Sequence, residues 1–270
     1  MPHISVIITT YNRKDFAAEA VESVRKQTCS DYELIIVDDG STDGSREILG
    51  PKADKYIFQK NAGVSAARNA GFTASSGKYI CFLDSDDLWM KDKLDVQIDF
   101  MEKNPSMPLC YTGEKWLKCG SHKNQKKHHS KRGGDIFVKC LEMCIISPSS
   151  AMIRRETLER LKFDEKLPVC EDYDMWLRIS SEHNIAYIDR ELIIKRGGHP
   201  GQLSESEPAM DRFRIYSIIK ALKSGLSPER EKLAKAELRR KCAIVRSGAL
   251  KRFKPWLWAK YGLISKFYGS

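Results

Sequence analysis

Three polar clusters each follow a short apolar run in the first third of the sequence. They span Thr9 to Arg13, Asp38 to Ser45 and Asp84 to Asp87. Carboxylates in such places suit hydrogen bonding to a base or a ribose, or oxygen ligation of a hard divalent cation. Asp84 and Asp86 are two residues apart, so in an extended segment both side chains point to one side and could share Mg²⁺ or Mn²⁺. Such an ion neutralises a diphosphate leaving group.

Alternating strand-like and helix-like segments must position these clusters. The predicted strands are Ile4 to Ile8, Tyr32 to Val37, Tyr56 to Phe58 and Tyr79 to Leu83. The predicted helices between them are Asp15 to Gln27, Ser41 to Leu49 and Val64 to Ser75. This alternation is typical of an α/β fold with a mainly parallel sheet flanked by helices, in which ligands bind at the carboxyl ends of the strands. All three clusters therefore fall where such a sheet binds ligands.

The second half continues with less regular elements. We expect helices at residues 91–104, Asp135 to Met143, Arg155 to Leu161 and Asp172 to Glu182. We expect extended segments at Leu109 to Leu117, Ser150 to Ile153 and Ile185 to Ile188, with a basic loop from Lys118 to Arg132. The region from Ala209 to the end is helix-like and very basic.

Composition and missing motifs exclude several classes of protein. The chain has 270 residues, and 46 Lys and Arg against 36 Asp and Glu give a net charge of +10. A hydrophobic fraction of 41% excludes a disordered chain. The first strand is not followed by Gly-x-Gly-x-x-Gly, and no Gly-Lys-Ser/Thr loop occurs, which argues against a dinucleotide-binding dehydrogenase and a P-loop enzyme. The basic residues match no RNA- or DNA-binding motif, so we expect no nucleic-acid partner.

The sequence favours a cytoplasmic location. No apolar run approaches the roughly 20 residues of a membrane-spanning helix, and the first residues do not resemble a secretory signal. The eight cysteines contain no Cys-x-x-Cys pair, as expected for reduced, mostly structural thiols. A zinc site remains an alternative, although its spacing matches no common pattern; it would draw on Cys110, Cys119, His122, His128, His129, Cys140 and Cys144.

Five segments in this order and at these separations resemble the family 2 inverting glycosyltransferases of the GT-A fold. The segments are SVIITTYNR, ELIIVDDGSTDGS, NAGVSAARNAG, GKYICFLDSDD and EDYDMWLR. The resemblance covers roughly residues 3–205. It implies a nucleoside-diphosphate-sugar donor, with UDP as the expected nucleotide, a divalent cation and an acceptor hydroxyl.

The resemblance also implies roles for individual residues. The implied donor-binding residues are Thr9, Tyr11, Asn12, Asp38, Asp39, Arg68, Asp84 and Ser85. The implied ligands of Mg²⁺ or Mn²⁺ are Asp84, Asp86 and His199. The implied catalytic residues are Asp172, as the base, and Glu171.

Asp172 suits the role of base on physical grounds. An inverting displacement needs one carboxylate on the acceptor side and no enzyme nucleophile. At the start of a predicted helix, Asp172 would be held ionised by the helix dipole. The alternative is that Glu171 and Asp172 only cap that helix.

We predict a GT-A domain at residues 1–205, with a nucleotide-sugar-binding half at 1–110 and an acceptor half at 111–205, and a basic helical C-terminal extension at 206–270. Cations and aromatics alternate from Lys251 to Tyr261, which is typical of an interfacial helix on anionic lipid at the inner face of the membrane. The alternative is a basic helix packed on the domain with its tryptophans inward.

The expected function is therefore metal-dependent, inverting transfer of a sugar to a hydroxyl of a glycan or lipid-linked acceptor in surface polysaccharide or cell-envelope biosynthesis. Two alternatives remain: a nucleotidyltransferase that forms sugar nucleotides, and a noncatalytic module that binds a nucleotide sugar or a lipid. A nucleotidyltransferase should carry a Gly-rich basic loop after the first strand, and TTYNRKD lacks the glycines. Intact Asp84, Asp86 and Asp172 count against the noncatalytic module.

Overall fold

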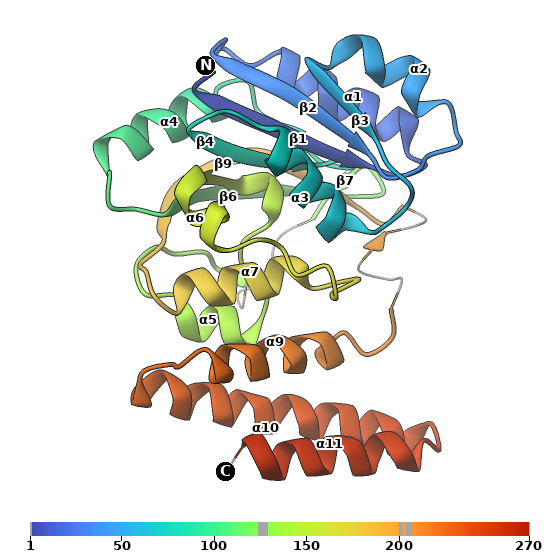
Figure 1. Ribbon diagram of the computed structural model, residues 1–270, viewed down its shortest axis with the longest axis vertical. Coiled ribbons are helices and arrows are strands. Elements are labelled where there is room, and N and C mark those ends of the chain that lie inside the picture. Colours follow the sequence, from blue (N-terminus) through green and yellow to red (C-terminus); the bar gives the residue numbers. More distant parts are fainter. Residues whose placement is uncertain (1, 124–128, 200–201, 204–206, 270) are drawn as a thin grey trace.

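The computed structural model of the chain describes residues 2–123, 129–199, 202–203 and 207–269 (Figure 1). Within these residues, one sheet of nine strands runs through the upper part of the molecule, in the order β3-β2-β1-β4-β8-β6-β9-β5, with β7 paired to β6. The strands are β1 Ile4–Thr10, β2 Tyr32–Asp38, β3 Lys55–Phe58, β4 Tyr79–Asp84, β5 Leu88–Trp89, β6 Leu109–Lys118, β7 Ser121–His122, β8 Ala151–Arg154 and β9 Ala186–Gly197.

The register of the sheet brings the polar clusters together. Strands β1 to β4 are mutually parallel, and Thr10 lies opposite Asp38 while Thr9 lies opposite Asp84. The adjacent β8 runs antiparallel to β4, and β9 is parallel to β6. The sheet is thus mixed, with a parallel half that carries the clusters at one edge.

Helices cover both faces of the sheet. They are α1 Lys14–Arg25, α2 Ser45–Leu49, α3 Val64–Ala74, α4 Lys93–Lys103, α5 Phe137–Glu142, α6 Arg155–Arg160, α7 Glu171–Ser180, α9 Asp211–Lys223, α10 Pro228–Lys251 and α11 Pro255–Tyr268. In β1, Ile4, Val6 and Ile8 pack with α1 and α4, whereas Ile7 faces the core beneath α3 and α7. This alternation is the period of two expected for a strand buried on both faces.

Helix α3 lies unusually close to the sheet. A Cβ atom at Gly71 would lie 2.4 Å from Cγ2 of Ile7 and 3.1 Å from Cγ2 of Val37. Only glycine permits this approach, because any side chain would push the helix away from β1 and β2. The approach fixes the depth at which Arg68, one turn earlier in α3, enters the interior.

Two elements differ from the sequence expectation. Strand β9 extends from Ala186 to Gly197 rather than ending at Ile188, because it pairs along β6, with a bulge at Gly113, and with β5. Helix α2 begins at Ser45 instead of Ser41. The Asp43 carboxylate accepts hydrogen bonds from the backbone N–H and hydroxyl of Ser45, so the preceding residues form a loop.

The C-terminal helices pack in sequence beneath the sheet domain (Figure 1). Helix α9 contacts α7, α10 contacts α9 and α5, and α11 contacts α10. Ile218, Leu238 and Tyr261 belong to the same hydrophobic core as the α3 face of the sheet. None of the described helices is long and apolar enough to cross a membrane.

The prediction of one interfacial helix from Lys251 to Tyr261 is wrong. Helix α10 ends at Lys251 and α11 begins at Pro255. Proline lacks an N–H and clashes with the preceding turn, so a helix cannot continue through this position undisturbed. Phe253 lies in the connection, with φ at 51°.

Candidate active site

A cavity of about 1200 Å³ opens at the carboxyl ends of β1, β2 and β4. Segments from β6, β9, α7 and α9 line its opposite side. The sequence-predicted residues in its lining are Thr9, Tyr11, Asn12, Asp39, Arg68, Asp84, Ser85, Asp86, Glu171 and Asp172. Asp38 and His199 are not among the lining residues, although His199 contacts Asp86.

Two aspartates end β2 and serve different local purposes. Asp39 accepts hydrogen bonds from the backbone N–H of Ala62 at 2.9 Å and of Gly63 at 2.8 Å, so its carboxylate holds the loop before α3. Asp38 is fully buried, and one of its oxygens accepts from the Tyr56 hydroxyl at 2.5 Å. Asp38 therefore supports the loop from behind, while Asp39 reaches the cavity.

The β1 loop is tied to the β2 loop by one asparagine. Asn12 has a φ of 50°, its N–H donates to the Ser41 hydroxyl, and its side-chain oxygen accepts from the Thr42 N–H, both at 2.8 Å. Tyr11 beside it is half exposed over the cavity. The loop thus presents Thr9 and Tyr11 to a ligand from a fixed backbone.

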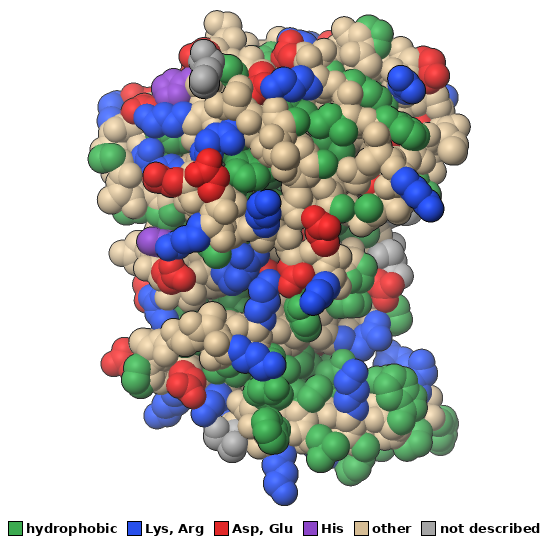
Figure 2. All heavy atoms as spheres, viewed as in Figure 1, with side chains coloured by type: hydrophobic (Ala, Val, Ile, Leu, Met, Phe, Trp, Pro, Cys, Tyr) green, Lys and Arg blue, Asp and Glu red, His purple; other side chains and the backbone are tan. Residues whose placement is uncertain are grey.

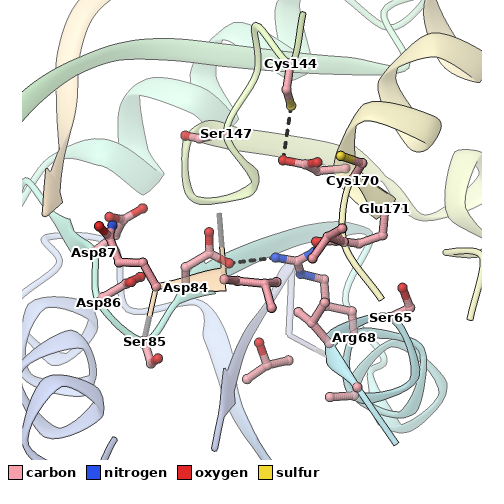
Figure 3. A pocket seen from close by; sticks show the side chains of 18 of the residues that line it. Ser65, Arg68, Asp84, Ser85, Asp86, Asp87, Cys144, Ser147, Cys170 and Glu171 are labelled. Atoms are coloured by element: carbon pink, nitrogen blue, oxygen red, sulfur yellow. Dashed lines mark hydrogen bonds and ion pairs between the residues drawn. The ribbon is translucent and has the colours of Figure 1, made fainter. Parts of the chain in front are cut away.

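Arg68 bridges two sides of the cavity. Its guanidinium donates to Asp84 at 2.7 Å and to Glu171 at 2.5 Å, and it is almost completely buried (Figure 3). Burial raises the pKa of Glu171 to about 7 against the pull of Arg68, and the charge of Asp172 adds to the rise. The arginine therefore positions the end of β4 relative to the start of α7, because it binds a carboxylate of each.

Asp86 is the carboxylate best placed for a cation. One of its oxygens lies 2.9 Å from Nη1 of Arg13 and 3.0 Å from Nε2 of His199. Among the described residues, no three His, Cys, Asp or Glu side chains are grouped to hold a metal ion. Oxygen and imidazole donors suit Mg²⁺ or Mn²⁺, so Asp86 and His199 fit a cation whose coordination is completed by phosphate oxygens of a ligand.

Asp87 differs from its neighbour because it is buried. Its carboxylate accepts from the Ser149 hydroxyl at 2.7 Å and from the Arg196 N–H at 3.2 Å. Burial and the charges of Asp86 and Asp84 raise its pKa well above the usual range, although Lys195 opposes this. Asp87 therefore fixes the β4 loop to β9.

Asp172 lies at the first turn of α7 and faces the cavity. Its Oδ2 accepts a hydrogen bond from the Cys144 thiol at 3.1 Å (Figure 3). Burial and the nearby carboxylate raise the pKa of Cys144, so the thiol remains protonated and can donate. Cys170, which precedes the helix, has a φ of 63°, a conformation that a residue with a side chain rarely adopts.

The opposite wall contains residues that the sequence analysis did not select. Glu114 and Lys131 form a buried ion pair at 2.5 Å, with only 3% and 6% of their side chains exposed. Lys195 lines the same wall from β9. Burial opposes ionisation of Glu114, but Lys131 and Lys195 lower its pKa to about 2. The available signal was an acid inside the predicted apolar strand Leu109 to Leu117.

Buried polar atoms without a partner concentrate at this cavity. In the part of the chain that the structure describes, nine such side-chain atoms occur, and five belong to residues that line it. The five residues are Thr10, Arg68, Ser147, Arg196 and Arg214. Unpaired buried polar groups are costly, so their concentration here indicates a site shaped for a polar ligand.

The zinc alternative finds no support in the described residues. Cys110 and Cys140 are buried in the hydrophobic core, and Cys144 contacts Asp172. No metal-binding group of His, Cys, Asp or Glu side chains includes them there. His128 lies outside the described residues.

Comparisons with known proteins agree with this arrangement. The Bacillus subtilis protein TuaG, whose name assigns it provisionally to teichuronic acid biosynthesis as a glycosyltransferase, is 34% identical over 192 residues, covering 69% of this chain and 75% of TuaG. The structure of Staphylococcus aureus TarS 1–349 with UDP-GlcNAc matches with a TM-score of 0.79 and 19% identity, covering 96% of this chain and 79% of that one. Mannosyltransferase PcManGT of Pyrobaculum calidifontis with GDP-Man and Mn²⁺ matches with a TM-score of 0.64 and 17% identity, covering 99% and 87%.

The chain spans about a third of the length of several Rickettsia relatives that it matches. The likeness to the solved structures confirms the expected GT-A-type α/β fold. Residues 5–162 match the glycosyl transferase family 2, which confirms the resemblance drawn from the five segments. The chain belongs to glycosyl transferase family 2.

Proposed function

We propose that this chain transfers a sugar from a nucleoside-diphosphate sugar to an acceptor hydroxyl, with inversion at the anomeric carbon. The proposal rests on one observation: a single cavity is lined by carboxylates from two different elements. Asp84 and Asp86 line it from the end of β4, and Asp172 lines it from α7. An in-line displacement needs this separation, because the leaving group and the acceptor lie on opposite faces of the sugar.

Each wall has its own task in this proposal. Thr9, Tyr11 and Asp39 bind the base and ribose of the donor. Asp172 accepts the proton of the attacking hydroxyl. Glu171 and Arg68 position the start of α7, because their ion pair joins it to α3. Asp86 and His199 would hold a Mg²⁺ or Mn²⁺ ion together with the donor phosphates, and the ion would supply positive charge to the departing diphosphate. Asp84, the third ligand that the resemblance implies, instead contacts Arg68.

Two relatives support the choice of donor and cofactor. TarS was solved with UDP-GlcNAc, and PcManGT with GDP-Man and Mn²⁺. We propose a UDP-linked sugar as the first donor to test. The name of TuaG supports an acceptor in a surface polysaccharide or another cell-envelope glycan.

A thermal-shift panel of nucleotide sugars with and without Mn²⁺ tests the proposal. A ligand at about 100 times its Kd should add about 2.7 kcal/mol of stability. The matching donor should then release nucleoside diphosphate slowly by hydrolysis, which a noncatalytic binding module would not do. A chain that no nucleotide sugar stabilises, with or without metal, contradicts the proposed function.

The Asp86→Ala variant tests whether Asp86 binds the metal ion. We expect the variant to lose the part of nucleoside-diphosphate binding that depends on metal and to keep the fold. Asp15→Ala is the matched control, because Asp15 is an exposed carboxylate at the start of α1 and does not line the cavity. Equal metal dependence of calorimetric binding in Asp86→Ala and the wild type would contradict the assignment.

We also propose that α11 rests on anionic lipid, which would place the cavity beside a lipid-linked acceptor. Helix α11 is apolar on two faces. Its inner face packs on the core through Leu257, Tyr261, Ile264 and Tyr268. Trp256, Leu263 and Phe267 directly precede Leu257, Ile264 and Tyr268. They form an outer face and are 63%, 69% and 80% exposed. Figure 2 shows hydrophobic side chains gathered at this end of the molecule beside lysine and arginine side chains.

The positive charge of the C-terminal region favours anionic lipid over a second copy of the chain as its partner. Residues 238–270 contain nine Lys and Arg and no Asp or Glu. Exposed Phe253, 93% accessible, lies in the connection between the two helices among Lys251, Arg252 and Lys254. A second copy of this chain would present the same positive charge and be repelled, whereas an anionic bilayer attracts each basic residue by about 1 kcal/mol.

Vesicle flotation tests the lipid proposal. We expect the chain to float with phosphatidylcholine vesicles that contain 30% phosphatidylserine (roughly a third anionic, as the electrostatic argument requires), and to be released by salt. Phe253→Ser with Phe267→Ser should weaken flotation, and Phe58→Ser is the control, because Phe58 is exposed on β3. Salt-insensitive flotation, or none, contradicts the proposal, and self-association in sedimentation would favour a second copy.

A further inference from the structure

Lys195 is a cation in the cavity wall that contacts no carboxylate among the residues that the structure describes. It lies near the end of β9, opposite Trp116 in the register with β6, and it lines the cavity. Its ammonium lies 5.8 Å from the centroid of the Trp116 ring. Within residues 2–123, 129–199, 202–203 and 207–269, Lys195 makes no hydrogen bond and no ion pair.

Carboxylates surround Lys195 without binding it. Burial disfavours its charged form, but Glu114, Asp87 and Asp84 outweigh that cost and raise its pKa, so the ammonium stays charged. Each of these carboxylates has a nearer partner, and the pairs are Asp84 with Arg68, Asp87 with Ser149, and Glu114 with Lys131. A charged donor that faces a cavity without an acceptor is costly unless a ligand supplies one.

Lys195 lines the same cavity as residues of both proposed sites. Asp84 at the end of β4, Asp87 in the loop that follows, and Cys144, whose thiol contacts Asp172, all act on the charge of Lys195. These residues and Asp172 line the cavity together. Lys195 therefore belongs to the lining that the proposed donor site and the proposed base share.

We propose that the Lys195 ammonium binds a phosphate of the donor, the one attached to the sugar, and stabilises the departing nucleoside diphosphate. This inference rests on the proposed function. In the displacement, the acceptor oxygen forms a bond to the anomeric carbon and loses its proton to Asp172. The bond from that carbon to the phosphate oxygen breaks, and the oxygen leaves with the electron pair. The leaving group gains one negative charge next to Lys195.

The charge balance of the loop supports this role. Asp84 and Asp86 would repel a diphosphate. Arg68 and Arg13, which form ion pairs with them, are each already in contact with a carboxylate. Among the described residues, no carboxylate contacts Lys195 directly, so its positive charge remains available in this wall. A divalent cation bound to Asp86 would add its positive charge to that of Lys195 rather than replace it. Asp86 follows β4, whereas Lys195 lies on β9.

Calorimetry in EDTA isolates the contribution of the protein. The measurement compares the affinity for the nucleoside diphosphate that gives the largest thermal shift with the affinity for its nucleoside. We expect the wild type to prefer the diphosphate and Lys195→Gln to reduce this preference by about 10- to 100-fold, as for a hydrogen bond to a charged group. Lys195→Arg should keep most of it. Lys115→Gln, an exposed lysine on the neighbouring strand β6, should leave it unchanged.

Chemical labelling gives a second readout on the unaltered chain. Acetylation of lysines at about pH 10, where lysine amines are partly neutral, continued until Lys195 is measurably labelled in the ligand-free chain and followed by peptide mass spectrometry, should show Lys195 protected by the nucleoside diphosphate but not by the nucleoside. Lys115 should be labelled equally in both. This measurement decides the question even where Lys195→Gln does not fold.

The outcomes separate the two proposals. If the wild type binds neither nucleoside diphosphates nor nucleosides, with or without Mn²⁺, the proposed function itself fails. If it binds them but shows no preference for the diphosphate in EDTA, or an equal preference in Lys195→Gln, the inference about Lys195 is wrong. Equal labelling of Lys195 with nucleoside and nucleoside diphosphate also overturns it.

Discussion

Two buried glutamates face the same cavity in opposite electrostatic settings. Glu114 lies between two cations, Lys131 and Lys195, and its pKa is lowered to about 2 although burial opposes this. Glu171 shares the guanidinium of Arg68 with Asp84 and is followed by Asp172. Burial and Asp172 raise its pKa to about 7.

The pKa values of the two glutamates differ because Glu114 has two cations near it, whereas Glu171 and Asp84 share one. The wall formed by β6 and β9 has a surplus of positive charge, which suits a phosphate. The wall at the start of α7 has a surplus of negative charge, which suits the removal of a proton. A transferase needs both, because it must hold a leaving anion at one place and take up a proton at another.

The largest effect should come from removing the proposed proton acceptor, Asp172, on the negative wall. Asp172→Asn keeps the shape of the side chain but removes its ability to take the proton. Sugar transfer should fall by about 10²- to 10⁴-fold, while calorimetric binding of the nucleoside diphosphate stays near the wild type.

Glu171→Gln is the comparison variant for this prediction. It should have a milder effect on transfer, because Glu171 positions the start of α7 through Arg68. If Glu171→Gln abolishes transfer and Asp172→Asn retains it, Glu171 is the base instead of Asp172. Full activity in both variants would leave Glu171 and Asp172 as a helix cap and require another base.

The positive wall should be tested through stability. Glu114→Gln leaves Lys131 buried without its counter-ion, and breaking a buried pair in this way costs about 3–5 kcal/mol of unfolding free energy. Urea unfolding measures the loss. Asp99→Asn, which breaks the exposed pair with Lys103 on α4, should cost no more than about 0.5 kcal/mol. A loss in Glu114→Gln as small as that of Asp99→Asn would remove the contrast between the two settings.

The smallest effect, when expressed per pH unit, should appear in the pH dependence of stability, with opposite signs for the two glutamates. The pKa of Glu114 is about 2 in the folded chain against an ordinary value of 4.5, so its contribution is present above pH 4.5 and is lost as the pH falls toward 2. The pKa of Glu171 is about 7, so its contribution is present below pH 4.5 and is lost as the pH rises toward 7.

Unfolding in urea between pH 4.5 and 7 isolates the second of these slopes. Uptake of one proton changes the free energy of unfolding by at most about 1.4 kcal/mol per pH unit. Glu171→Gln should remove that downward slope, while Glu114→Gln should keep it. An unchanged slope in Glu171→Gln would show that another group carries the proton.

The donor-side wall could be predicted from the sequence because its residues are local. Asp39 directly follows β2 and Asp84 ends β4. The apolar residues of both strands identify them, and parallel strands bring their carboxyl ends together. The family resemblance then identified Glu171 and Asp172. The sequence could not show that Arg68 contacts both Asp84 and Glu171, because the contact joins three separate segments.

The positive wall could not be predicted, for a related reason. Lys195 comes near Glu114 only because β9 pairs along β6, and Lys131 reaches Glu114 from a position 17 residues further along the chain. The apolar pattern ended the last predicted strand at Ile188, since Asp189, Arg190 and Glu191 interrupt it. These three residues are exposed, and the strand continues past them by backbone pairing, which a side-chain pattern does not record.

The attachment of β9 to the β4 loop has a consequence for the order of events during turnover. Arg196 donates from Nε to the backbone carbonyl of Asp86 and from its N–H to the carboxylate of Asp87. Lys195 and His199 lie on the same stretch of chain, so this stretch can hardly shift while Asp86 stays in place. We therefore expect the nucleoside diphosphate to leave only when this stretch and the β4 loop move together, which would make product release, rather than bond cleavage, the step that sets the rate of turnover.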